Sequence, residues 1–289
     1  MRRRAWWGTV IVAGVVLAAG LAWWLNRPRD AEVESRRLTS GGVERTFGWF
    51  RPESVTDDTA RHPAVIVLHG LGLEGKGMAY IGGWGQPAEA GEFVVAFPDG
   101  LERSWNAGGC CGASMRNGAD DVAFIEDLVA WVRRQPEVDP ARVSLAGYSN
   151  GGMLALALAC DPPEGVSAVV TSGALPTKAC AIRVPPDVLL ITSPDDPTVP
   201  PTGGQGNLAA EDQSAPFPSL TDSLALMGDG NACGAPSASE APFEGRLTQR
   251  SCRDGSRLDA ASWPGLGHAY DSRVTNLMVW WLGLDGAAG

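Results

Sequence analysis

The sequence predicts an α/β fold in which a central, mostly parallel β-sheet carries helices on both faces. Short runs of apolar, often β-branched residues recur along the chain, and segments with apolar residues at helical spacing lie between them. Such runs are typical of strands that are buried on both faces of a parallel sheet. Because parallel strands need a long crossover connection, usually a helix, this alternation favours the α/β class.

The expected elements follow one another in a regular order. Strands are predicted over residues 63–68, 92–97, 142–146, 166–171, 188–192 and 258–262. Helices are predicted from Asp120 and Asp121 onward, over 153–159, near 220–227 and over 272–284. In the first of these helices the apolar residues recur at i, i+3, i+4 and i+7, so one face is expected to be buried; they are Ile125, Leu128, Val129 and Val132.

The first 29 residues predict an N-terminal membrane anchor. Three arginines precede an unbroken apolar run over 5–25, which is long enough to span a hydrocarbon core of about 30 Å. Tryptophan pairs lie at both ends of this run, where indoles favour the membrane interface. A cleaved signal peptide is the alternative, but the run is long for one and lacks a good cleavage site. We expect an anchor over 1–29, a tether over 30–44 and one exported domain over 45–289.

The charge balance argues against a nucleic acid partner. The chain has 33 acidic and 23 basic residues, and five of the arginines lie within the first 29 residues. The exported part is therefore strongly acidic, whereas phosphate binding needs concentrated Lys and Arg. With three histidines and no Cys-x-x-Cys spacing, the chain also lacks a zinc pattern, and we expect no metal and no cofactor.

Six cysteines indicate disulfides formed in an oxidising compartment. The spacing suggests two pairs and leaves the third open: Cys233 with Cys252 across a hairpin-like segment, Cys160 with Cys180 after neighbouring elements, and Cys110 beside Cys111 as a vicinal bridge or as two thiols.

A Gly-x-Ser-x-Gly pattern over 147–151 joins the strand expected at 142–146 to the helix expected at 153–159. A serine on such a sharp strand-to-helix turn projects its hydroxyl out of the fold, toward a base that deprotonates it. Gly147 and Gly151 permit the turn, because a side chain at either position would clash with the neighbouring strand or helix. Ser149 is therefore the candidate nucleophile.

His268 is the candidate base. A serine hydroxyl needs an imidazole to take its proton, and the imidazole needs a carboxylate to hold its tautomer. His268 is the only histidine after Ser149, and it lies on a Gly-rich loop before the last helix. His62 begins a strand, so it is expected at the opposite end of the sheet as a solvated residue.

The acid of this group is expected on the loop over 192–200, which follows a buried strand and carries two adjacent aspartates. Ligands of open α/β sheets bind beyond the carboxyl ends of the strands, where Ser149 and His268 are also expected. Asp196 is our choice, Asp195 is the alternative, and Asp271 fits better as the N-cap of the last helix.

Two backbone N–H groups are expected to form an oxyanion hole. One belongs to Asn150, because the first N–H groups of a helix have no partner within it. The other belongs to Leu71, on a loop where Gly70 and Gly72 let the backbone approach closely. His69, at the start of this loop, is expected to support it through hydrogen bonds.

Six motifs occur in order along the chain: Val65-Ile-Val-Leu-His-Gly70, Phe97-Pro-Asp-Gly100, Ser104-Trp-Asn106 with Gly109-Cys-Cys-Gly112, Asp120-Asp-Val122, Gly147-Tyr-Ser-Asn-Gly-Gly-Met153 and Asp196-Pro-Thr-Val-Pro200. Over about 45–284 the chain resembles the polyhydroxybutyrate depolymerase and feruloyl esterase group of secreted α/β-hydrolases. The resemblance implies an α/β-hydrolase fold, a triad of Ser149, Asp196 and His268, and an oxyanion hole of Leu71 and Asn150. It also implies that Trp105 lies near the substrate cleft, while a core position fits this tryptophan equally well.

We therefore expect an extracytoplasmic, membrane-anchored serine esterase that hydrolyses carboxylic esters through an acyl-enzyme. The acyl groups expected are short-chain, hydroxyalkanoate or feruloyl. Soluble or short substrates are preferred to solid polyester, because the sequence shows no polymer-binding domain. The polar segment 201–231 is expected to be a lid or an exposed loop. An acyltransferase with a sugar or lipid acceptor, and a non-catalytic envelope binding module, are the alternatives; a monomer is expected.

Overall fold

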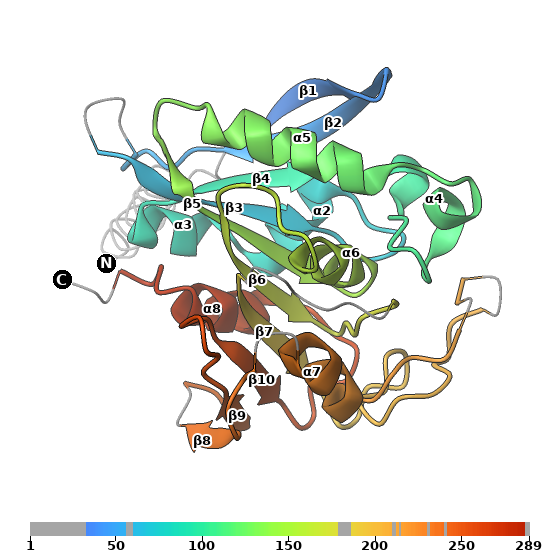
Figure 1. Cartoon of the computed structure of the whole chain (residues 1–289). Helices are drawn as coiled ribbons and strands as arrows, with labels where there is room; N and C mark the ends of the chain where they lie inside the picture. The colour runs from blue at the N-terminus through green and yellow to red at the C-terminus, as the bar shows by residue number, and fades with distance from the viewer. Residues whose placement is uncertain are drawn as a thin grey trace, which may run out of the picture. The chain divides into compact units, whose positions relative to one another are not determined.

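Ten strands of the described residues form one sheet in the computed structural model (Figure 1). The structure describes residues 33–55, 60–178, 186–209, 212–213, 215–229, 232–239 and 242–286. Across the sheet the order is β1 (Glu34–Ser40), β2 (Val43–Phe50), β4 (Val94–Pro98), β3 (His62–Leu68), β5 (Val138–Tyr148), β6 (Val166–Ser172), β7 (Asp187–Thr192), β10 (Leu258–Ser262), β9 (Arg246–Gln249) and β8 (Ser237–Ser239). The six central strands β4, β3, β5, β6, β7 and β10 run parallel to one another. The strands at both edges, β1 with β2 and β8 with β9, join the sheet by antiparallel pairing. The predicted mostly parallel sheet is confirmed.

Helices cover both faces of this sheet (Figure 1). Helices α5 (Asp121–Arg133) and α6 (Asn150–Ala159) pack on one face, against β5 and its neighbours. Helices α2 (Gly75–Gly82) and α8 (Ser272–Trp281) pack together on the other face. The remaining helices are shorter or lie outside these layers: α3 (Gly85–Gly91), η1 (Leu101–Arg103), α4 (Gly112–Arg116) and α7 (Leu220–Asp229).

The central strands form because their side chains are buried on both faces. All residues of β3 after His62 are buried, and β4 is buried throughout. Helix α5 shows the predicted single buried stripe, since its four expected apolar positions are at most 1% exposed. The side chain of Asp120 caps this helix by accepting a hydrogen bond from the Ala123 N–H.

The prediction of a tether over 30–44 is wrong in part, because residues 34–40 form the edge strand β1. The strand pairs along its whole length with β2. Most of its side chains are exposed, and charged residues pair locally, as Arg36 does with Glu34 and Arg37 with Glu44. A strand whose side chains are mostly exposed needs little apolar pattern, so the composition of this segment resembled that of a linker.

The segment 201–231, expected as a lid or an exposed loop, packs onto the core where the structure describes it. Phe217, Leu224 and Met227 are 5%, 7% and 2% exposed, so apolar residues anchor the segment. The predicted helix near 220–227 is present as α7. The segment is therefore not simply an exposed loop.

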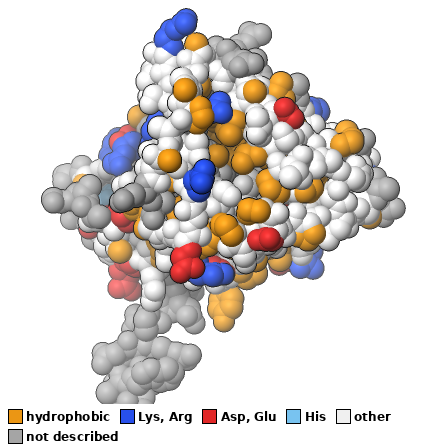
Figure 2. Space-filling model, turned by 90° about the horizontal axis from the view of Figure 1, so that it is seen from below, with side chains coloured by type: hydrophobic (Ala, Val, Ile, Leu, Met, Phe, Trp, Pro, Cys, Tyr) orange, Lys and Arg blue, Asp and Glu red, His pale blue; other side chains and the backbone are white. Residues whose placement is uncertain are grey.

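The predicted anchor over 1–29 lies outside the described residues. Within the described ranges, no helix has both the length and the apolar character that crossing a membrane requires. Figure 2 shows one face of the molecule, on which apolar side chains lie in separate groups among charged residues of both signs.

Candidate active site

Ser149 lies at the turn between β5 and α6, as the sequence predicted. Its φ of 51° is unusual for a residue with a side chain, and such a conformation costs about 1–3 kcal/mol. Neighbouring backbone leaves no space for a side chain at either motif glycine. A Cβ on Gly147 would lie 2.6 Å from Gly152 Cα, and one on Gly151 would lie 2.4 Å from the His69 carbonyl oxygen. The two glycines thus allow the chain to hold Ser149 in this turn.

His268 lies on the loop between β10 and α8, and its imidazole joins the other two predicted residues. Its Nε2 is 3.0 Å from Ser149 Oγ, and its Nδ1 is 2.8 Å from Asp196 Oδ2. The Asp196 side chain is 1% exposed, whereas that of His268 is 16% exposed. The structure therefore brings the three residues into one chain of hydrogen bonds. Within it, the His268 side chain is more accessible to solvent than that of Asp196.

The two adjacent aspartates have different partners. Asp196 Oδ1 accepts hydrogen bonds from the N–H groups of Thr198, at 2.8 Å, and Val199, at 2.9 Å, which leaves Oδ2 for His268. Asp195 is exposed, and its Oδ2 accepts from the Gly265 N–H at 2.7 Å. Asp195 thus connects the acid loop to the histidine loop, and Asp196 contacts the imidazole.

Two hydroxyl groups that no sequence pattern indicated hold the histidine loop in place. The Tyr148 hydroxyl donates to the His268 carbonyl oxygen at 3.1 Å. Burial, with a smaller effect of the Asp196 charge, raises the pKa of Tyr148 to about 12, so this donor keeps its proton. Ser193 Oγ accepts from the Gly267 N–H at 3.0 Å. Tyr148 occupies the variable position of the Gly-x-Ser-x-Gly pattern, and no sequence signal marks its partner 120 residues away.

The Leu71 and Asn150 N–H groups have no hydrogen-bond partner among the described residues. Asn150 begins helix α6, whose first N–H groups lack intrahelical acceptors. Leu71 follows β3 on a turn in which the Leu73 N–H donates to the Gly70 carbonyl. Asn150 follows Ser149 directly, and Leu71 follows Gly70, where an added Cβ would lie 3.5 Å from Ser149 Cβ. Their role as oxyanion donors stays a prediction.

His69 supports the Leu71 loop through both ring nitrogens, as predicted. Its Nδ1 is 2.8 Å from the Gly70 carbonyl oxygen, and its Nε2 accepts from the Gly100 N–H at 2.9 Å. Nδ1 must therefore carry the proton, and the imidazole is neutral. Burial lowers the pKa of His69 below its ordinary value of 6.5. His62, by contrast, lies at the amino end of β3 and contacts the Glu92 carbonyl, at the opposite end of the sheet.

The neutral state of His69 predicts that stability falls at mildly acidic pH. The unfolded chain takes up a proton at the ordinary pKa of 6.5 and the folded chain does so only at lower pH. The free energy of unfolding should therefore decrease as pH falls below about 6.5. Thermal unfolding followed between about pH 7.5 and 5.5 should show this loss in the wild type and in His62→Gln, and a smaller loss in His69→Gln. Parallel curves for all three proteins would contradict the assignment.

Trp105, predicted as a substrate-binding residue near the cleft, occupies the alternative core position in the structure. Its side chain is fully buried, at 0% exposure, and its indole N–H donates to the His69 carbonyl at 2.9 Å. The ring stacks on Phe124 and lies beside the His69 ring. Trp105 is therefore a core residue under the loops of the site, the alternative that the sequence had left open.

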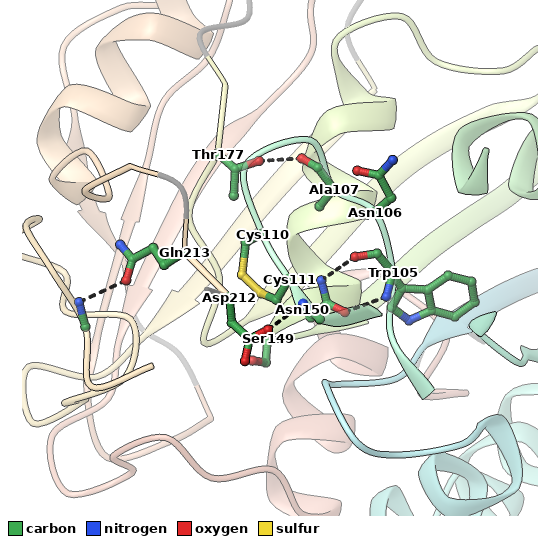
Figure 3. Close-up of a disulfide and its surroundings, with 12 residues drawn as sticks. Trp105, Asn106, Ala107, Cys110, Cys111, Ser149, Asn150, Thr177, Asp212 and Gln213 are labelled. Atoms are coloured by element: carbon green, nitrogen blue, oxygen red, sulfur yellow. Dashed lines mark hydrogen bonds between the residues drawn. A yellow bond between two sulfur atoms is a disulfide. The ribbon is translucent and has the colours of Figure 1, made fainter. Parts of the chain in front are cut away.

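The Cys110–Cys111 pair forms a vicinal disulfide, and segment 201–231 pairs with it (Figure 3). Gln213 forms an isolated antiparallel bridge with Cys110. Asp212 Oδ1 accepts from the Gly112 N–H at 3.0 Å and from Arg116 at 2.7 Å. The predicted Cys233–Cys252 disulfide is confirmed. The remaining prediction involves Cys180, which lies outside the described residues.

A metal centre is not assembled in the part of the chain that the structure describes. No three His, Cys, Asp or Glu side chains there come together as ligands would. The geometry instead supports nucleophilic chemistry, since it contains a serine, a base, an acid and two free N–H donors.

Comparisons with known proteins find esterases. A family model named "Esterase", with the description "Putative esterase", matches residues 39–197. The curated protein "Putative esterase NocK" of Nocardia uniformis subsp. tsuyamanensis is 29% identical over 175 residues, which are 59% of this chain and 51% of that protein. "Feruloyl esterase B" of Piromyces equi is 24% identical over 186 residues, which are 61% of this chain and 34% of that protein. The chain thus spans about half or less of the length of these relatives.

A solved structure, "Acetyl xylan esterase from Aspergillus awamori", is similar over 87% of this chain and 99% of that chain. Its TM-score is 0.63 and its sequence identity is 14%. At this identity the similarity concerns the fold alone.

Proposed function

Because the chain belongs to the Esterase family and has the α/β-hydrolase fold, we propose that it hydrolyses carboxylic esters through an acyl-enzyme intermediate. One observation carries this proposal: Asp196, His268 and Ser149 form a continuous chain of hydrogen bonds of 2.8 and 3.0 Å. Asp196 accepts from the Nδ1–H of His268, so the lone pair of Nε2 faces the serine hydroxyl. This is the arrangement in which an imidazole acts as a general base.

Each step of the reaction uses a group of this site. Ser149 Oγ attacks the ester carbonyl carbon while His268 Nε2 takes the hydroxyl proton, and the negative charge that develops on the carbonyl oxygen is stabilised by the Leu71 and Asn150 N–H groups. The imidazolium then protonates the departing alcohol, which leaves the acyl group on Ser149. Water, deprotonated by His268, attacks the acyl-enzyme, and the carboxylic acid leaves as Ser149 recovers its proton.

The substrate class that we propose is an ester of a short or an aromatic acyl group carried by a saccharide. The support is that similar proteins are named acetylxylan esterase and feruloyl esterase. Release of acetate from acetylated xylan, or of ferulate from feruloylated oligosaccharides, should exceed the release of hydroxybutyrate from its oligomers. The opposite order would contradict this substrate class and leave the reaction type unaffected.

Covalent labelling tests the proposed nucleophile. A fluorophosphonate probe reacts with an activated serine, so the wild-type protein should be labelled and Ser149→Ala should not. Ser167→Ala is the matched control, since this exposed serine lies near the amino end of β6, at the opposite end of the sheet from Ser149, and should leave labelling unchanged. Wild-type protein that neither takes up the probe nor hydrolyses p-nitrophenyl acetate would contradict the proposed function.

We also propose that the domain acts outside the cytoplasm. The support is the presence of two disulfides among the described residues, because disulfides persist in oxidising compartments. Fractionation of the cells that make the protein would test this, together with the anchor predicted for residues 1–29. Recovery of the protein in the cytoplasm with reduced cysteines would contradict it.

A further inference from the structure

The side chain of Asn150 joins two segments of the site that are far apart in sequence. Its Oδ1 accepts from the Trp105 N–H at 2.7 Å, and its Nδ2 donates to the Trp105 carbonyl at 2.9 Å (Figure 3). Asn150 is fully buried, so water does not compete for these bonds. The amide thus pairs with both backbone groups of one residue, in the manner of a neighbouring β-strand.

Trp105 carries this connection to the opposite side of the site. Its indole N–H donates to the carbonyl of His69, which is two residues before Leu71. The His69 ring in turn binds the Gly70 carbonyl and the Gly100 N–H. Every bond in this series involves a buried or half-buried group, so each is worth more than it would be in water.

We propose that the Asn150 carboxamide is a positioning residue that fixes the two oxyanion donors relative to each other through Trp105. This inference rests on the proposed acyl transfer at Ser149. The Asn150 N–H belongs to the helix α6 side of the site, and the Leu71 N–H belongs to the β3 side. Strands β3 and β5 pair up to Leu68 and Gly147, three residues before each donor, and the Asn150–Trp105–His69 series connects the two segments beyond the end of this pairing.

The chemistry explains why asparagine suits this position. The Trp105 N–H needs an acceptor and the Trp105 carbonyl needs a donor, and a carboxamide offers both at the required separation. An aspartate offers two acceptors when it is ionised, so one of its oxygens would face the Trp105 carbonyl. A protonated aspartic acid restores the donor. Burial at this position raises the pKa of such a carboxyl, which favours the protonated form at mildly acidic pH.

The first test compares steady-state kinetics of Asn150→Ala with a matched control. Donors displaced by a fraction of an ångström stabilise the oxyanion less, so Asn150→Ala should lower kcat by about 100-fold and leave KM within about threefold. The affinity for a boronic acid, which forms a tetrahedral adduct on the serine, should fall in parallel with kcat. Asn106→Ala is the control, because this side chain also makes two backbone hydrogen bonds, to Ala119 and Gly108, without reaching the Ser149 turn. It should lower kcat by less than about fivefold.

The second test uses Asn150→Asp and does not depend on the stability of the alanine variant. Both proteins contain the same His268, so the ratio of the variant's kcat to the wild-type kcat removes the titration of the base. This ratio should rise as pH is lowered from about 8 to 5.5, as the introduced carboxyl gains a proton. Measurements belong well below the thermal midpoint of each variant, so that unfolding does not contribute.

The outcomes separate this inference from the proposed function. If the wild type is active and Asn150→Ala keeps its kcat, or shows only a raised KM, the positioning role alone is overturned. The positioning role is also overturned if the ratio of the Asn150→Asp kcat to the wild-type kcat stays constant or falls as pH is lowered. A wild type without esterase activity or probe labelling overturns both proposals.

Discussion

Replacing Asp196 by Asn should lower kcat for p-nitrophenyl acetate by about 10⁴-fold, the loss expected when a triad acid is neutralised. The reason lies in the partners of the carboxylate. The Thr198 and Val199 N–H groups both point at Oδ1, so the oxygen of the new amide must take that place. Its NH₂ group would then face His268 and donate to Nδ1. The imidazole would carry its proton on Nε2, where it cannot accept the proton of Ser149.

The neighbouring aspartate provides the control for this prediction. Asp195→Asn keeps an oxygen that accepts from the Gly265 N–H, so kcat should change by less than about tenfold, the effect of one weakened hydrogen bond. Both variants should retain the thermal midpoint of an intact fold. Equal losses for the two variants, or a larger loss for Asp195→Asn, would show that the carboxylates have exchanged roles.

Replacing Arg45 by Met should lower the free energy of unfolding by about 3–5 kcal/mol. Arg45 lies on β2 and Asp121 begins α5, and their side chains meet at 2.7 Å with exposures of 3% and 0%. The guanidinium also lies over the Phe124 ring. Methionine fills much of the same volume but leaves the Asp121 charge buried, with the backbone N–H of Asn106 still donating to its Oδ2. Urea unfolding would measure the change.

Two further variants distinguish a buried charge from lost packing. In Arg45→Met combined with Asp121→Asn, the uncompensated charge is gone, so part of the lost stability should return. Arg36→Met removes an exposed ion pair with Glu34 and should cost less than about 1 kcal/mol. The single variant Asp121→Asn gives the reference for additivity. If the free energy losses of Arg45→Met and Asp121→Asn simply added in the double variant, the loss in Arg45→Met would come from packing and not from the buried charge.

The regular part of the fold was predictable because burial leaves a periodic trace in the sequence. The six central strands and the buried stripe of α5 lie where apolar runs and helical spacing indicated. The edge strand β1 was missed because most of its side chains are exposed to solvent. Short helices such as α2 and α4 were missed as well, since few residues in them face the core.

The sequence by itself determined the residue types of the site and their order along the chain. A serine between two obligatory glycines, one histidine after it and a pair of aspartates between them left few alternatives. These residues were recognisable because local chemistry demands them: a tight turn needs glycine, and a serine nucleophile needs a base and an acid.

Only the tertiary structure decided between alternatives that share the same local sequence. Asp196 and Asp195 are neighbours in one loop, and the direction of each carboxylate depends on backbone N–H groups and on a loop about 70 residues away. Trp105 lies in the core, and the side chain of Asn150 binds the backbone of Trp105, 45 residues away in the sequence. Such pairings follow from the three-dimensional meeting of β3, β5 and the loops beyond them, which no spacing within a single segment records.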